Sequence, residues 1–183
     1  IFNELEVDEL VFLDIAVSRK KLRPNFALLE DIASECFMPL GYGGGIASLA
    51  DAKTIFDIGF EKVIINTHAE NNPALITEIA SIYGSQAVMV SIDVKRSRRG
   101  DMVHTLSGTH NTRRDPVSWA REAERLGAGE ILLTSIDSEG TWQGMDLDLV
   151  SQVASAVSIP VIAHGGVGNI QHIADAVNVA NAS

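Results

Sequence analysis

Short apolar runs alternate along this chain with longer segments whose apolar residues recur at helical spacing. The amphipathic segments predict helices over residues 25–36, 49–58, 74–83, 115–126, 146–156 and 169–179, with the tail of another helix at 2–7. The apolar runs predict buried strands over residues 10–13, 39–42, 62–65, 87–92, 130–136 and 160–163. Regular alternation of strands and helices, without a long linker, is typical of a parallel α/β sheet. Residues 96–114 interrupt the rhythm and predict a small hairpin.

Two stretches of the chain resemble each other. Residues 39–46 (PLGYGGGI) match residues 160–167 (PVIAHGGV), and the same offset of 121 positions maps residues 9–13 onto 130–134. A constant offset over this length indicates an internal duplication. Duplicated strand–helix units, each with a glycine turn at a strand end, predict a (β/α)8 barrel built from two half-barrels rather than an open sheet.

The repeat also predicts how much of the barrel is present. The strand at 87–92 needs a counterpart 121 positions earlier, before Ile1, and the strand at 62–65 needs one near Ser183. We therefore expect residues 1–183 to form a single barrel domain that lacks the first strand and most of the eighth unit.

Composition and charge argue against several classes of function. Hydrophobic residues make up 46% and charged residues 21%, and the net charge of −10 argues against nucleic-acid binding. The lone Cys36 excludes a disulfide framework, and no metal-ligand spacing is visible, so neither metal nor cofactor is expected. Because no apolar run approaches 18 residues and no signal peptide is apparent, we expect no membrane span and a cytoplasmic location.

In a barrel of this kind, the functional residues lie where the strands end. The glycine turns at Gly44-Gly45 and Gly165-Gly166 would let a phosphate approach bare backbone N–H groups. Two such turns predict a ligand with two phosphates, although each could also be a tight turn without a ligand. Asn66 and Thr67 would complete the first site, unless they only cap a turn, and Gly140 would complete the second.

Asp93 is the first candidate for catalysis because it ends an otherwise apolar strand. A carboxyl group there should have a raised pKa, which suits general acid or base chemistry. The alternative is a structural carboxylate paired with Lys95 or Arg96.

Charged residues also occur where strands begin. Glu9, Lys62 and Glu130 open three strands and should lie on the opposite face of the barrel. They predict either an ion-pair ring or a polar gate to a channel along the barrel axis. His104 and His110 fall on the hairpin and are expected to be solvated, whereas His164 replaces the glycine found at position 43.

Several runs of the sequence carry a family resemblance. The segments ELVFLDIAVS, GGGI, INT, GSQAVMVSIDVKR and GAGEILLTSID, starting at residues 9, 43, 65, 84 and 127, closely resemble the cyclase subunit of imidazole glycerol phosphate synthase, the HisF family. The resemblance implies a lyase of histidine biosynthesis. Such an enzyme uses ammonia to convert a bisphosphate ribulosyl-formimino aminoimidazole carboxamide ribonucleotide into imidazole glycerol phosphate and aminoimidazole carboxamide ribonucleotide.

The resemblance also assigns roles to residues and implies a partner. Asp93 falls on the family's acid/base aspartate, and Glu9, Lys62 and Glu130 fall on the gate through which ammonia enters from a glutaminase subunit of the HisH type, docked on the N-terminal face. The phosphate sites match Gly45, Asn66 and Thr67 on one side and Gly140 and Gly166 on the other.

Departures from the family pattern leave other activities open. His164 stands where the family commonly has serine, and Glu139 where it commonly has aspartate. Residues 34–42 are more similar to paralogues tied to sugar amidination, which would conduct ammonia from a glutaminase to a sugar amidotransferase. A related bisphosphate isomerase barrel is a third, less similar alternative.

Overall fold

A curved parallel sheet forms the centre of the molecule. The computed structural model describes residues 7–20, 22–98 and 100–183, and the predicted helix tail at 2–7 lies mostly outside these residues. The six predicted strands are confirmed and pair in parallel, in the order β1 (Leu10–Leu13), β2 (Leu40–Gly43), β3 (Lys62–Ile65), β4 (Val88–Ser97), β7 (Glu130–Ser135) and β8 (Val161–His164).

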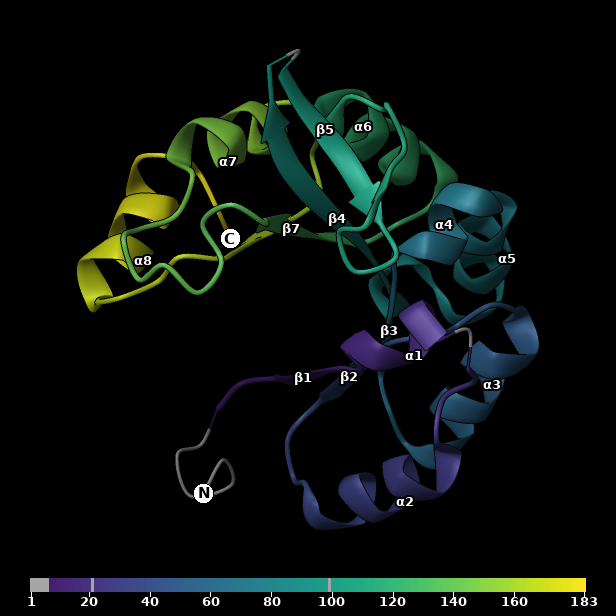
Figure 1. Ribbon diagram of the computed structural model, residues 1–183. Helices are drawn as coiled ribbons and strands as arrows, with labels where there is room; N and C mark the ends of the chain where they lie inside the picture. Colours follow the sequence, from purple (N-terminus) through teal and green to yellow (C-terminus); the bar gives the residue numbers. More distant parts are fainter. Residues whose placement is uncertain (1–6, 21, 99) are drawn as a thin grey trace.

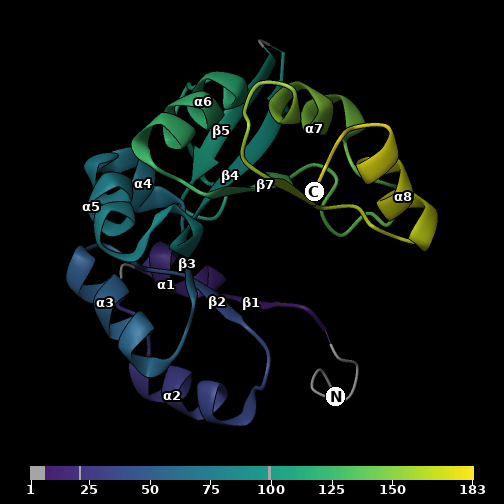
Figure 2. The ribbon, with the colours of Figure 1, turned by 180° about the vertical axis from the view of Figure 1, so that it is seen from behind.

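Helices cover the outer side of this sheet in an arc (Figures 1 and 2). The six predicted in full are confirmed with small shifts of their ends, as α2 (Phe26–Glu35), α3 (Leu49–Ile58), α5 (Ala74–Tyr83), α6 (Pro116–Leu126), α7 (Leu147–Ala154) and α8 (Ile170–Asn178). Sequence analysis missed two short helices at strand ends, α1 (Ile15–Lys20) and α4 (Thr67–Asn71), and a 3-10 turn at Ser85–Ala87.

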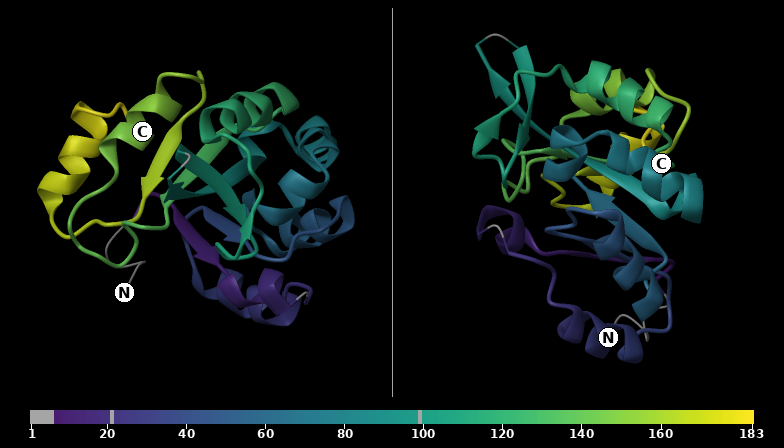
Figure 3. Two further views of the ribbon diagram at one scale, coloured as in Figure 1. Left: turned by 45° about the horizontal axis from the view of Figure 1, so that its top comes forward. Right: turned by 90° about the vertical axis from the view of Figure 1, so that its right-hand side faces the viewer.

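The sheet curls into a half-barrel with its helices outside, which confirms the predicted barrel class (Figures 1 and 3). Among the described residues, β1 and β8 are the two ends of the parallel pairing order and do not pair with each other. That the chain lacks a first strand and most of an eighth unit stays a prediction, as does its organisation as one domain.

The predicted duplication is visible in the bounds of the elements. Strand β8 occupies the positions of β2 shifted by 121 residues, and α8 begins where α3 begins after the same shift. Ser48 caps α3 by accepting a hydrogen bond from the backbone N–H of Asp51, and Asn169 caps α8 in the same way from His172. The two repeats therefore share the same kind of helix cap as well as the same order of elements.

The interrupted segment forms the predicted hairpin. Strand β4 runs on past the rim of the sheet and pairs antiparallel with β5 (Gly100–Thr105), which pairs with β6 (His110–Asn111), and the hairpin projects from the body of the molecule in Figure 3. The expectation of solvated histidines is correct for the exposed His110 and wrong for His104, which is only 8% exposed. The register of the hairpin places His104 opposite the buried end of β4, where its backbone partner is Asp93.

Side chains pack on both sides of the sheet. The outer layer, between strands and helices, holds the larger core and includes Trp119, Ile55 and Ile131. The inner layer is a small apolar cluster of Ile64, Met89 and Leu132. Burial of apolar surface in both layers drives the strands and helices together.

The turn between β2 and α3 is held by a buried carboxylate. Asp51 is 3% exposed, and it accepts hydrogen bonds from the backbone N–H of Ala47, the hydroxyl of Ser48 and the guanidinium of Arg23. Burial raises the pKa of Asp51, but the hydrogen bonds from Arg23, Ser48 and Ala47 outweigh it and leave the pKa below its ordinary value. The ionised form therefore stabilises the fold.

We expect Asp51→Asn to lower the free energy of unfolding at pH 7 by roughly 1–3 kcal/mol, because an ionised acceptor is lost. A lowered pKa contributes stability above the unfolded pKa that disappears as the pH falls through the folded one, so the difference from wild type should shrink under acid conditions. Urea unfolding of both proteins at several pH values measures this. Equal stability at pH 7 would show that the carboxylate does not hold the turn.

Candidate functional site

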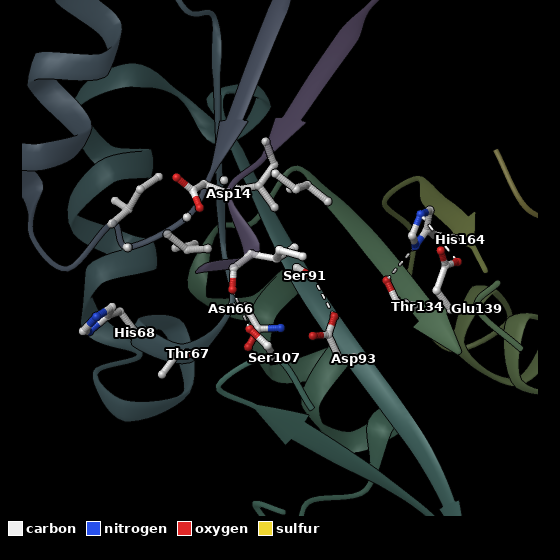
Figure 4. A pocket seen from close by; sticks show the side chains of 18 residues that line it. Asp14, Asn66, Thr67, His68, Ser91, Asp93, Ser107, Thr134, Glu139 and His164 are labelled. Atoms are coloured by element: carbon white, nitrogen blue, oxygen red, sulfur yellow. Dashed lines mark hydrogen bonds and ion pairs between the residues drawn. The ribbon is translucent and has the colours of Figure 1, made fainter. Parts of the chain in front are cut away.

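A pocket of about 320 Å³ opens where the parallel strands end (Figure 4). It brings together five of the predicted site residues from three parts of the chain: Asp93, Gly44, Gly45, Asn66 and Thr67. Its wall also includes Asp14, His68, Ser91, Ser107, Thr134, Glu139 and His164. Residues far apart in the sequence meet here because parallel strands all end at the same edge.

The alternation of side chains along β4 explains why Asp93 faces the pocket. Successive side chains of a strand point to opposite faces, so Met89, Ser91 and Asp93 share one face of β4. Met89 lies in the inner apolar cluster, which places Asp93 above that cluster at the rim. Its partner across the sheet is Thr134.

Asp93 has the environment expected of an acid/base residue. Burial raises the pKa of its carboxyl group, and the hydrogen bond from Ser91 Oγ (3.1 Å) and the charge of His164 offset this only in part. The alternative, a structural carboxylate paired with Lys95 or Arg96, is not realised. Arg96 pairs with Asp101 and Asp146, and within the described part of the chain no ion pair joins Asp93 to a lysine or arginine.

The first turn at the pocket wall requires glycine. Gly44 and Gly45 have positive φ angles of 141° and 65°, and a Cβ at Gly45 would collide with the side chain of Val17. Nearby, Asn66 Oδ1 is buried without a hydrogen-bond partner, while Thr67 Oγ1 accepts a hydrogen bond from the backbone N–H of Leu106 at 3.1 Å. The Asn66 oxygen therefore has an unused acceptor at the pocket wall.

The second set of predicted phosphate residues lies in an adjoining pocket. Gly140, Gly165 and Gly166 do not line the first pocket but a second one of about 260 Å³. Gly165 and Gly166 also have positive φ angles, of 102° and 91°, and a Cβ at Gly165 would lie 2.8 Å from the carbonyl oxygen of Ser135. Of the described residues, only Glu139 and His164 line both pockets, so they form the boundary between them.

The three charged residues at the strand starts meet on the opposite face. Lys62 Nζ donates to Glu9 Oε2 at 2.9 Å and to Glu130 Oε1 and Oε2 at 2.9 and 2.8 Å. Burial lowers the pKa of Lys62, but its hydrogen bonds to Glu130 and Glu9 outweigh this and raise it. This geometry fits both an ion-pair ring and a gate. The inner apolar cluster separates these charges from Asp93.

Sequence analysis missed the part of the hairpin that borders the pocket. Ser107 lines the first pocket, and its hydroxyl donates to the backbone carbonyl of Ile15 in α1 at 2.9 Å. Leu106 and Ser107 have positive φ angles of 53° and 55°, which few residues other than glycine adopt. The sequence predicts a hairpin over residues 96–114, but no local pattern indicates what its end contacts.

The described residues also limit other kinds of site. In the described ranges, no group of three or more His, Cys, Asp or Glu side chains could hold a metal ion. Within the same ranges, no helix has the length and apolarity needed to cross a membrane.

Comparison with known proteins agrees with this architecture. The profile of a family described as histidine biosynthesis protein matches residues 1–183. The chain is 47% identical over 180 residues to imidazole glycerol phosphate synthase subunit HisF of Chlorobium phaeobacteroides, which covers 98% of this chain and 71% of the relative. It is 44% identical over 182 residues to HisF of Sulfurisphaera tokodaii, which covers 100% of this chain and 73% of that relative.

A further relative comes from Pseudomonas aeruginosa. It is provisionally named imidazole glycerol phosphate synthase subunit hisF2 and is 48% identical over 176 residues, which cover 96% of this chain and 70% of the relative. With the family profile matching residues 1–183 and identities of 44–47% over at least 98% of the chain, this chain belongs to the HisF branch of the histidine biosynthesis protein family.

Proposed function

We propose that this chain is the cyclase subunit of imidazole glycerol phosphate synthase, a lyase that uses ammonia to form imidazole glycerol phosphate in histidine biosynthesis. The observation that carries the proposal is the position of Asp93, a buried carboxyl group with a raised pKa in a pocket that adjoins a second glycine-lined pocket. The chemistry needs both an acid/base group and room for a ligand with two phosphates, and these pockets offer both.

Asp93 would move protons during the reaction. Addition of ammonia to a carbon of the substrate transfers protons from nitrogen to oxygen, and a carboxyl group with a raised pKa can accept and return them near neutral pH. The turn at Gly44 and Gly45, with Asn66 and Thr67, would hold one phosphate, and Gly140, Gly165 and Gly166 would hold the other. Backbone N–H groups in such turns form concave sites for anions.

Ammonia would enter from the other end of the barrel. We propose that a glutaminase subunit of the HisH type docks on the face where Glu9, Lys62 and Glu130 lie, and that these residues gate the passage of ammonia. The small, uncharged ammonia molecule would then cross the apolar layer toward Asp93. The reaction would take place in the cytoplasm, as the sequence predicts.

A second candidate is a barrel that conducts ammonia to a sugar amidotransferase without catalysing cyclisation. The run at residues 34–42, which resembles paralogues tied to sugar amidination, favours it. The two candidates differ in one assay. The cyclase turns over the ribonucleotide with ammonium salt, whereas the conduit stimulates its glutaminase but leaves the ribonucleotide unchanged.

We expect Asp93→Asn to lower turnover with ammonium salt by about 10²- to 10⁴-fold, with little change in KM, because an acid/base group is removed while the pocket keeps its shape. Steady-state kinetics of the full protein measure this. The matched control is Asp57→Asn, which changes an exposed aspartate paired with Lys53 and should behave as wild type. Unchanged turnover of Asp93→Asn would remove this residue from the mechanism.

The raised pKa of Asp93 also predicts the acid limb of the pH–rate profile. If the ionised carboxylate accepts a proton, kcat should fall as the pH drops through a value above the ordinary aspartate pKa of about 3.9. The assay must hold free ammonia constant, because ammonium also titrates. A profile that is flat down to the ordinary aspartate range would contradict the role of Asp93 as a base.

We expect Lys62→Met to lower glutamine-dependent turnover several-fold more than ammonium-dependent turnover, because only the first uses the gate. The ratio of the two rates, measured on the complex with its glutaminase, tests this. Thermal unfolding shows whether the two unpaired carboxylates of Glu9 and Glu130 destabilise the barrel. An equal fall in both rates would assign Lys62 to the plain ion-pair ring.

A further inference from the structure

The two pockets contain few groups that could neutralise an anionic ligand. Among the described residues that line either pocket, none is a lysine or an arginine. The titratable side chains are three carboxyl groups and two imidazoles: Asp14, Asp93, Glu139, His68 and His164. A ligand with two phosphates brings at least two negative charges to this site. Its positive partners among these side chains are therefore limited to histidines.

His164 is the histidine that both pockets share. Its Nδ1 lies 3.3 Å from Thr134 Oγ1, its Nε2 lies 4.0 Å from Glu139 Oε2, and its side chain is 46% exposed. Figure 4 shows His164 beside Thr134 and Glu139, at a distance along the rim from Asp93. His68, by contrast, lines only the first pocket.

Backbone register fixes His164 in this position. Asp93, Thr134 and His164 are paired in sequence across β4, β7 and β8, so they form one row at the rim. Neighbouring strands lie about 4.8 Å apart, which places the two ends of the row about 10 Å from each other. A ligand that spans both pockets would therefore touch Asp93 at one end of the row and His164 at the other.

We propose that His164 is a specificity-determining residue whose imidazolium form pairs with the anionic group held at Gly165 and Gly166, and so selects ligands with two phosphates over ligands with one. The proposal deepens the proposed function and depends on it, since it takes the substrate to be a bisphosphate. Serine or asparagine at this position could donate a hydrogen bond but could not supply charge.

The charged and polar groups near His164 come from the strands and from the loop after β7. Glu139 faces it from that loop and the uncharged Thr134 from β7, while Asp93 on β4 stands at the far end of the row. Protonation of an imidazole increases as the pH falls, so the contribution of a charged ring to affinity should be larger at pH 6 than at pH 8.

The test compares His164→Ser and His164→Asn with wild type at pH 6 and pH 8. Both variants should raise KM for the bisphosphate substrate about five- to tenfold at pH 6, because a charge-assisted hydrogen bond is lost, and about twofold or less at pH 8. The kcat value should stay within about threefold of wild type, since Asp93 is intact. Phosphate groups also titrate near pH 6, so the comparison uses the ratio of variant to wild type at each pH.

The matched control is His110→Ser, which removes an exposed histidine on the hairpin and should leave KM unchanged at both pH values. An asparagine variant with wild-type KM at pH 6 would overturn the proposal, because a neutral donor would then suffice. A ratio that is the same at pH 6 and pH 8 would overturn it as well.

A binding measurement separates this inference from the proposed function. Inorganic phosphate should shift the ring-proton resonance of His164 in the wild-type protein at pH 6, and phosphate affinity should fall at least threefold in His164→Asn. If this holds while the wild type fails to turn over the ribonucleotide, the proposed function is wrong and the role of His164 stands. If turnover is normal but phosphate affinity does not change in the variant, the role of His164 is wrong and the function stands.

Discussion

The site depends on one constraint, the period-two alternation of side chains along parallel strands that are held in fixed register. On the inner face, this alternation places Lys62 and Ile64 of β3, and Asn66 directly after it, at successive heights, and it does the same on neighbouring strands. A shift of one residue in any strand would turn its inner side chains outward. Chemical groups at the rim are thus positioned by apolar residues earlier on the same face, two places before Asn66 and Thr134 and four before Asp93.

The layers on the inner face have different electrostatic roles. Charges meet at one end in the ion pairs of Lys62, a polar rim forms at the other end, and the cluster of Ile64, Met89 and Leu132 separates them. The apolar layer also keeps water away from the underside of Asp93, and desolvation is the largest cause of its raised pKa. The same packing therefore supports the fold and raises the pKa of the Asp93 carboxyl group.

The sequence predicts the parts of this arrangement that are encoded locally or by repetition. The strands and the longer helices follow from periodicity, and the duplication reproduces the bounds of β2 in β8. Asp93 and the first glycine turn fall in one pocket as predicted. The prediction fails where contacts join distant segments. The hairpin is predicted, but residue spacing does not give the register that sets His104 opposite Asp93. Nor does it indicate that the two glycine turns line separate pockets.

The hydroxyl of Thr67 links the rim to the hairpin. Its oxygen accepts the amide hydrogen of Leu106, and its own hydrogen stays available to an anion in the first pocket. A hydroxyl that donates to an anion becomes a stronger acceptor, because hydrogen bonds in a chain polarise one another. An anion bound at the first glycine turn should therefore strengthen the hydrogen bond from Leu106 to Thr67, which holds the hairpin. Through this hydrogen bond, an anion bound at one strand end would affect the order of a segment about forty residues away in the sequence.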